Sequence, residues 1–165
     1  MKARGKGIVK GLRQIADATG SSIDITSKEG RIRVQKLVYL LKAGGYAPAQ
    51  KFEFNLYQNG PYSPDLTEVY FHFGNEGIAT AQGNGDTPAD LIGTITAADS
   101  KGVLFLEALA TTLDTTAALR KQGNIGANLS PGLSWARSIK PHIGETTWRE
   151  VREFLRAHPA LAGST

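Results

Sequence analysis

The segment from Ser27 or Lys28 to Ala43 constrains the fold of this chain more than any other. Val34, Leu37, Val38 and Leu41 follow the i, i+3, i+4, i+7 spacing of one helical face, and Ile32 and Leu40 widen this apolar stripe. The pair Gly44–Gly45 comes next and provides the positive φ that helix C-caps favour. We therefore expect a core helix over 28–43 whose solvent face is basic, with Lys28, Arg31, Gln35 and Lys42 on it and Arg33 and Lys36 nearby.

The rest of the chain has patterns of both helix and strand. A short amphipathic helix is expected over 7–18, and the alternation over 52–57 predicts a half-buried strand. Ser63, Pro64 and Asp65 are typical of the N-cap and first positions of a helix, which we expect to run to Phe73 and to end at Gly74–Gly77. Residues 78–82 and 91–96 predict a hairpin, in which Asn84–Gly85 is a turn dipeptide.

Towards the C-terminus, we expect a helix over 97–119, a loop over 122–132 that ends in Ser130–Pro131–Gly132, and a last helix. A capping box at Thr147–Glu150 is expected to open that helix. The fold class is therefore α+β and mainly helical: a compact winged-helix-like core with a small antiparallel sheet and an extra C-terminal helix. The length of 165 residues predicts a single domain over 1–165, with a basic N-terminal helix or arm over 1–22.

Composition excludes several kinds of site. The chain has no cysteine, which excludes disulfides, thiolate metal sites and cysteine nucleophiles. The three histidines are not spaced as a metal-binding pair, and no nucleotide-binding or nucleophile-elbow motif occurs. We therefore expect no catalytic residue, no metal and no cofactor, and hence no enzyme. With no apolar run of membrane-spanning length and no secretory signal, we expect a cytoplasmic protein that does not enter a membrane.

Charge is segregated along the chain. Met1–Lys51 has eleven basic and three acidic residues, 52–119 has nine acidic residues and one basic residue, and 120–165 has seven basic and three acidic residues, for a net charge of +4. Such segregation favours a polyanion-binding surface or a two-signed protein-binding surface. The expected helix over 64–73 has acidic residues and no Lys or Arg, so it is poorly suited to enter a DNA groove.

Two sets of candidate binding residues follow from these charges. For a protein partner, the candidates are Glu53, Asp65, Glu68 and Tyr62. For nucleic acid, the candidates are the basic helix and the basic terminus, and they include Arg31, Arg33, Lys36, Lys42, Lys6, Lys10 and Arg13. The sequence leaves the partner open and also allows a homo-oligomer.

Two motifs together resemble a known family. The run Gln35–Leu41 is followed by a strand with Phe52 and Phe54 and then by Tyr57-Gln58-Asn59-Gly60-Pro61-Tyr62-Ser63-Pro64-Asp65-Leu66. This pairing resembles the YwgA-like uncharacterised proteins of bacteria and archaea and is more distantly similar to the Panacea (SocA-like) antitoxin and phage-associated domain. The resemblance covers about 31–73, with weaker support at Ile95–Thr96 and Gly102–Leu109.

The resemblance implies a compact helical fold with a small sheet. We expect the family-like core to span 27–119, and 120–165 to form a loop plus C-terminal helix. It also implies a toxin–antitoxin, phage defence or mobile-element context. It supplies no catalytic residue, and Ser63 has a sufficient structural role as an N-cap. We therefore expect a non-enzymatic regulatory or antagonist module that binds a protein partner. The alternative is a DNA- or RNA-binding regulator that uses helix 28–42 and the basic termini.

Overall fold

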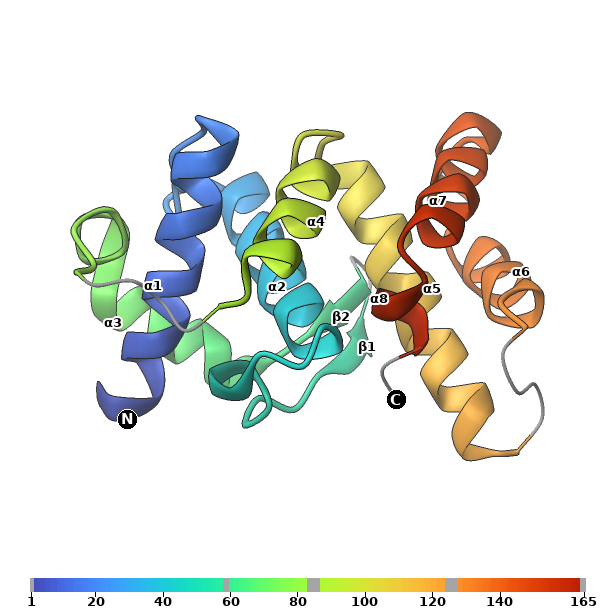
Figure 1. Cartoon of the computed structure of the whole chain (residues 1–165), viewed down its shortest axis with the longest axis horizontal. Coiled ribbons are helices and arrows are strands. Elements are labelled where there is room, and N and C mark those ends of the chain that lie inside the picture. Colours follow the sequence, from blue (N-terminus) through green and yellow to red (C-terminus); the bar gives the residue numbers. More distant parts are fainter. Residues whose placement is uncertain (1, 58–59, 83–86, 124–127, 164–165) are drawn as a thin grey trace.

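The fold is mainly helical, with one short β-ribbon. A computed structural model describes residues 2–57, 60–82, 87–123 and 128–163 (Figure 1). Among these residues the elements are α1 (Lys2–Thr19), α2 (Lys28–Ala43), the 3-10 turn η1 (Ala47–Ala49), β1 (Asn55–Tyr57), β2 (Gly60–Tyr62), α3 (Pro64–Ala79), α4 (Ala89–Asp99), α5 (Val103–Lys121), α6 (Ser130–Ile139), α7 (Glu145–Ala157) and α8 (Pro159–Gly163).

Helices α2 and α5 connect the two ends of the molecule. Helix α1 packs against α3 and α4, α2 packs against α5, and α5 packs against α6 and α7 (Figure 1). The buried apolar side chains of all these helices form one continuous core. The C-terminal helices α6 and α7 therefore attach to the rest of the chain mainly through α5.

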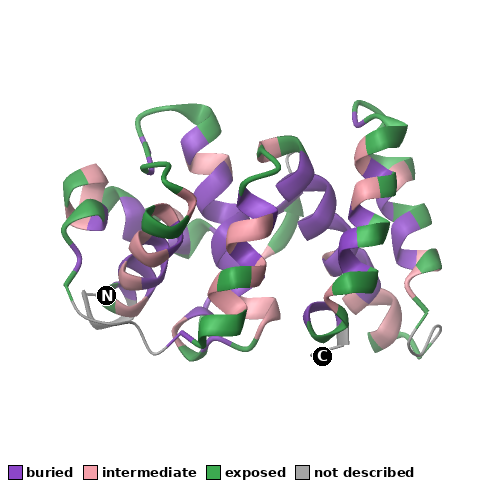
Figure 2. Cartoon of the chain, turned by 45° about the horizontal axis from the view of Figure 1, so that its top comes forward, coloured by how far each residue is buried: buried purple, intermediate pink, exposed green. Residues whose placement is uncertain are grey.

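The predicted core helix is confirmed as α2. Ser27 is its N-cap, and its Oγ accepts a hydrogen bond from the Gly30 N–H at 2.9 Å. Gly45, just past the C-terminus, has a φ of +86°, as glycine at such a position permits. Figure 2 shows α2 in the interior, and every residue from Arg33 to Leu41 is buried. The expected basic solvent face is therefore wrong for Arg33, Gln35 and Lys36, which lie inside the protein.

The only sheet in the described residues is the ribbon of β1 and β2. The two strands are antiparallel, with Asn55 opposite Tyr62 and Leu56 opposite Pro61. The predicted strand over 52–57 is thus strand only from Asn55. Phe52, which precedes it, is buried, and its carbonyl accepts a hydrogen bond from Lys42 Nζ at 2.6 Å.

Helix α3 begins as predicted and ends later. Ser63 Oγ accepts from the Leu66 N–H, and Pro64 occupies the first turn. Gly74 interrupts the helix with φ +68° and ψ 177°, but the chain resumes helical geometry and continues to Ala79. The helix over 7–18 likewise extends to Lys2–Thr19.

The predicted hairpin is wrong. Residues 78 and 79 end α3, and residues 91–96 lie in α4, whose Leu91, Ile92, Ile95 and Ala98 pack inward at helical spacing. The position where a winged-helix domain has its wing is therefore helical. Asn84 and Gly85 lie outside the described residues.

Three boundaries near the C-terminus also differ from the predictions. Helix α5 starts at Val103, because Gly102, with a φ of +99°, separates it from α4. Ser130–Pro131 begins α6 instead of ending a loop, and Gly132 lets α6 approach α5 so closely that a Cβ there would lie 2.0 Å from Thr116 Oγ1. Helix α7 begins at Glu145, so the capping box expected at Thr147 is wrong.

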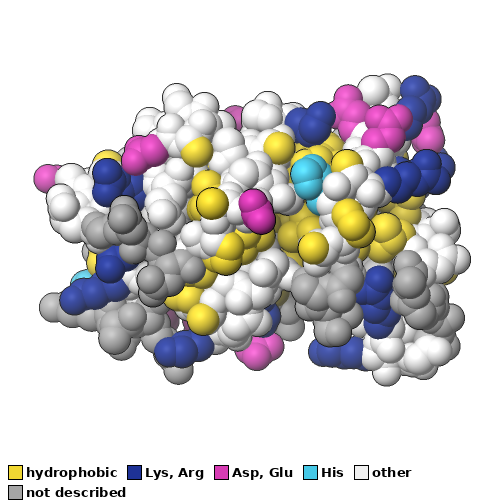
Figure 3. Space-filling view, in the orientation of Figure 1, with side chains coloured by type: hydrophobic (Ala, Val, Ile, Leu, Met, Phe, Trp, Pro, Cys, Tyr) yellow, Lys and Arg dark blue, Asp and Glu magenta, His cyan; other side chains and the backbone are white. Residues whose placement is uncertain are grey.

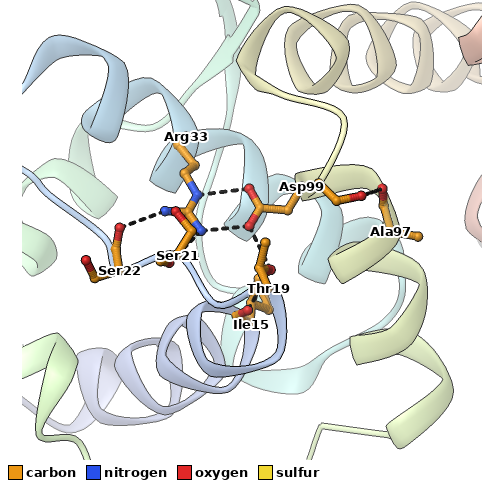
Figure 4. Close-up of polar contacts among 8 residues, drawn as sticks. Ile15, Thr19, Ser21, Ser22, Arg33, Ala97 and Asp99 are labelled. Atoms are coloured by element: carbon orange, nitrogen blue, oxygen red, sulfur yellow. Dashed lines mark hydrogen bonds and ion pairs between the residues drawn. The ribbon is translucent and has the colours of Figure 1, made fainter.

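A buried ion pair ties the N-terminal helices together (Figure 4). Arg33 of α2 donates to both carboxylate oxygens of Asp99 at the end of α4, with distances of 2.9 Å from Nε and 2.7 Å from Nη2. The same guanidinium donates to the carbonyls of Ser21 and Ser22. Thr19 at the end of α1 donates to Asp99 at 3.0 Å. The pair therefore joins α1, α2, α4 and the segment between α1 and α2.

We predict that Asp99→Ala destabilises the protein by about 3–5 kcal/mol, because it leaves the Arg33 guanidinium charged and unpaired in the interior. The free energy of unfolding in urea measures this loss. The matched control is Asp17→Ala, which removes a carboxylate that is 66% exposed and 3.3 Å from Arg13. That control is expected to cost less than about 1 kcal/mol. Equal losses in the two variants would show that the buried pair has no special role.

Candidate functional site

The Gln35 side chain holds the turn that leads into α3. Its Oε1 accepts a hydrogen bond from the Ser63 N–H at 2.8 Å, and its Nε2 donates to the Ser63 carbonyl at 3.0 Å. The same Nε2 donates to Thr67 Oγ1 at 3.1 Å. A primary amide is the group that can accept and donate in this way, so Gln35 satisfies both backbone groups of a buried residue.

Lys36, the next residue, holds the ribbon. Its Nζ donates to the Pro61 carbonyl at 2.8 Å, and the residue is only 1% exposed. Gly60 lies against it with a φ of +92°, and a Cβ there would lie 3.2 Å from Lys36 Cε and 3.0 Å from Thr111 Oγ1. Glycine therefore allows both the backbone conformation of the turn and the close approach of the lysine.

Burial changes the ionisation of this amine. It lowers the pKa of Lys36 to about 7, and the nearby Glu107 carboxylate opposes the shift only in part. Lys140 lowers the same pKa further, while Asp114 acts with Glu107 to raise it. Burial in turn raises the pKa of the Asp114 carboxyl, although the Tyr39 hydroxyl donates to it at 3.3 Å. Lys36 is thus a buried amine that changes charge near neutral pH.

A pocket of about 310 Å³ opens above Gln35 and Lys36, between α2 and α3. Its aromatic and aliphatic walls come from Ile32, Tyr62, Tyr70 and Phe71, and the remaining lining residues are Lys28, Arg31, Gln35, Lys36, Gly60 and Thr67. Thr67 Oγ1 positions both tyrosines, at 2.7 Å from the Tyr62 hydroxyl and 3.2 Å from the Tyr70 hydroxyl. The described lining includes the cations Lys28 and Arg31, the buried Lys36 amine and no carboxylate, so the pocket combines apolar walls with positive charge.

A shallower groove lies on the other side of the same part of α2. Its lining includes Lys28 and Ile32, which also line the first pocket, and adds Glu29, Lys101, Gly102, Val103 and Leu104. Phe71 at the first pocket is 56% exposed and Leu104 at the second is 54% exposed. We call the combined lining of the two hollows the α2 docking surface.

The structure places the predicted basic residues in different settings. Arg31 lines the pocket and also donates to the carbonyls of Ile25 and Thr26. Three of the other cations already have partners: Arg33 pairs with Asp99, Lys42 donates to the Phe52 carbonyl, and Arg13 donates to the Ala81 carbonyl and pairs with Asp17. The two remaining cations lie on α1, where Lys6 is exposed and Lys10 is half-buried. Arg33 and Lys36 are therefore not available as part of an exposed basic helix face.

The residues predicted to bind a protein are more accessible. Glu53, Asp65 and Glu68 are exposed, and Tyr62 is half-buried in the wall of the pocket. Asp65 and Glu68 lie on α3, the helix that contributes Thr67, Tyr70 and Phe71 to that wall. Neither carboxylate lines the pocket: Glu68 is one helical turn from Phe71, whereas the helical spacing places Asp65 on the side of α3 away from the wall.

Sequence reasoning missed Ile32, Phe71 and Leu104 as surface-forming residues, although it placed Lys28 on the solvent face of its helix. The signal for Phe71 was present, because Leu66, Val69, Tyr70 and Phe73 already fill one helical face and Phe71 lies beside it. For Leu104, the neighbouring helix start at Val103 had to be known first. For Ile32, the apolar stripe of α2 gave no indication that its N-terminal end borders two hollows.

A second buried charge cluster lies behind Lys36 on α5. Glu107 Oε1 is 3.3 Å from Lys140 Nζ and 3.3 Å from His142 Nε2. Glu107 and Lys140 are both buried, so they compensate each other inside the protein. In the described ranges, three metal-ligating side chains nowhere come together as a metal site. None of the described helices is long and apolar enough to cross a membrane.

Comparison with protein families, with curated proteins and with solved structures finds no match for this chain.

We predict that the stability of the wild type relative to Lys36→Met increases with pH above about 7. The folded amine has a pKa of about 7, whereas the unfolded lysine keeps its ordinary value, so the unfolded chain binds more protons in the interval between them. The relative gain is expected to be roughly 2 kcal/mol between about pH 7.5 and about pH 9. Urea unfolding of both proteins at each pH measures it. A difference that stays constant across this range would mean that Lys36 is not a buried amine of lowered pKa.

Proposed function

We propose that this chain is a non-enzymatic regulatory or antagonist module that binds a protein partner through the α2 docking surface. The toxin–antitoxin, defence or mobile-element setting is proposed from the resemblance of Gln35–Leu41 and Tyr57–Leu66 to the YwgA-like and Panacea proteins. The contacts of Gln35 and Lys36 support a structural role for these motifs, because each side chain binds the backbone of the turn at 60–63.

The observation that carries the proposal is the exposure of large apolar side chains around Ile32. Phe71 and Leu104 are each more than half exposed, whereas Leu56, Trp135 and Ile139 are between 37% and 39% exposed. Phe71 and Leu104 line adjoining hollows that share Ile32, so the two exposed side chains lie on either side of Ile32. Apolar area gathered in this way, with charged residues around it, is typical of a protein-binding site.

Two of the residues first predicted for a protein partner adjoin this surface. Tyr62 forms part of the pocket wall, and Glu68 lies one helical turn from Phe71 on α3. A partner that covers the pocket and extends past Phe71 therefore meets the Glu68 carboxylate on the α3 side and cations on the α2 side. This arrangement supports a two-signed binding surface, in which charge orients the partner and apolar contacts provide affinity.

The alternative is a DNA- or RNA-binding regulator that uses helix 28–42 and the basic termini, because α3, at the place of a winged-helix recognition helix, is poorly suited to a DNA groove. Helix α3 has acidic residues and no Lys or Arg, and Arg33 and Lys36 are buried. On the face drawn in Figure 3, the visible Lys and Arg side chains are scattered near the edges, and near α7 they lie beside Asp and Glu. These observations favour the protein partner over a phosphate backbone.

We predict that Phe71→Ser/Leu104→Ser loses the partner that the wild type recovers from cells of its native host. Removing two exposed apolar side chains costs binding free energy without opening a cavity in the core. Affinity capture followed by mass spectrometry measures the loss, with recovery reduced at least about tenfold.

The matched control is Trp135→Ser/Ile139→Ser, which removes two exposed apolar side chains of α6. It is expected to recover the partner at the wild-type level. If both double variants recovered the partner equally well, the α2 docking surface would not be the site that binds it. Recovery of nucleic acid without a stoichiometric protein, with affinity that falls steeply as salt rises, would favour the alternative.

A further inference from the structure

The charges around the α2 docking surface differ from one side to the other. Lys28 and Arg31 line the deeper pocket on its α2 side, and Lys101 lines the shallower groove together with Glu29. On the α3 side, the exposed Glu68 lies one helical turn from Phe71 of the pocket wall. An acidic segment laid across Ile32 is therefore attracted on the α2 side and repelled on the α3 side.

The shape of the pocket limits what enters it. A volume of about 310 Å³ is at the small end of ligand pockets, which are about 300–1,000 Å³. Such a hollow takes a few side chains of a partner and not a folded element. Its walls from Tyr62, Tyr70 and Phe71 present aromatic faces and edges, which favour an aromatic or large aliphatic side chain.

We infer that the partner segment is acidic and amphipathic: it seats an aromatic or large aliphatic side chain between α2 and α3 and directs its carboxylates at Lys28 and Arg31. This inference rests on the proposed function and specifies the chemistry of the partner. The shallower groove accepts a second apolar side chain of the same segment, beside Leu104 and within reach of Lys101. A basic segment is disfavoured, because it meets the cations of the deeper pocket.

The rim of the pocket makes this choice selective. Arg31 is held by the Ile25 and Thr26 carbonyls at 3.0 Å and 3.1 Å, so its guanidinium is fixed in position before a partner arrives. A fixed guanidinium loses little side-chain entropy when it binds a carboxylate, and its fork can donate to both oxygens. Arg31 is therefore the cation from which we expect the largest single contribution to charge selection.

The test is selection of random displayed peptides, long enough for several helical turns, on the full chain. Peptides retained by the wild type but not by Phe71→Ser identify those that use the proposed surface. We expect these peptides to be enriched in Asp and Glu around an aromatic or large aliphatic residue. We also expect Lys28→Glu/Arg31→Glu to weaken their binding at least about tenfold.

The control is Lys51→Glu/Arg149→Glu, which changes the net charge equally with two exposed cations that line neither hollow. It separates local charge recognition from long-range attraction, and it should leave peptide binding within about twofold. Circular dichroism of each variant establishes that the fold is retained.

Phe71-dependent peptides that are basic or neutral, or that bind the Lys28→Glu/Arg31→Glu variant as well as the wild type, would overturn the inference and leave the proposed function intact. If no selected peptide depends on Phe71, both the inference and the α2 docking surface are overturned.

Discussion

The fold depends on the burial of polar side chains along the central helix α2. Arg33, Gln35 and Lys36 are almost fully enclosed, and a buried polar group is costly unless it finds partners. Each of the three finds its partner outside α2: a carboxylate of α4, the backbone of Ser63 and the carbonyl of Pro61. These bonds draw α4, the β-ribbon and the start of α3 onto one helix. They are directional, so they fix positions that apolar packing alone leaves adjustable.

The same constraint shapes the candidate site. Gln35 and Lys36 hold the turn at 60–63, which carries Tyr62 into the pocket wall, and Thr67 of α3 links the two tyrosines. On the outer side of the same helix, Lys28, Arg31 and Ile32 face the opening. One helix thus provides the internal tethers of the turn and the outer edge of the α2 docking surface. This division accounts for a short run of sequence that contains both buried and exposed cations.

The parts of the fold that could be predicted are those with a local signal. Helix α2 follows from its apolar spacing and Ser27, and the start of α3 follows from Ser63–Pro64. A Ser–Pro pair also opens α6 at Ser130–Pro131, where Leu129 is the N-cap, yet the surrounding glycine and asparagine residues favoured a loop. Residues 91–96 resemble a strand because β-branched residues alternate there. They are helical because they pack against α1 and α2, which no local pattern reveals.

The burial of Lys36 could also have been predicted from the sequence. Apolar residues occur on nearly every side of α2, and such a helix is buried. The pocket itself needs α3 to be placed beside α2, which no local pattern specifies.

The central claim is that polar side chains of α2 hold the turn at 60–63 in place. Hydrogen exchange at the Ser63 backbone amide tests it most directly, because that amide donates to Gln35 Oε1. We expect slow exchange in the wild type and a loss of protection in Gln35→Ala, with exchange across α7 unchanged. Rapid exchange of the Ser63 amide in the wild type, or the same protection in the variant, would contradict the account.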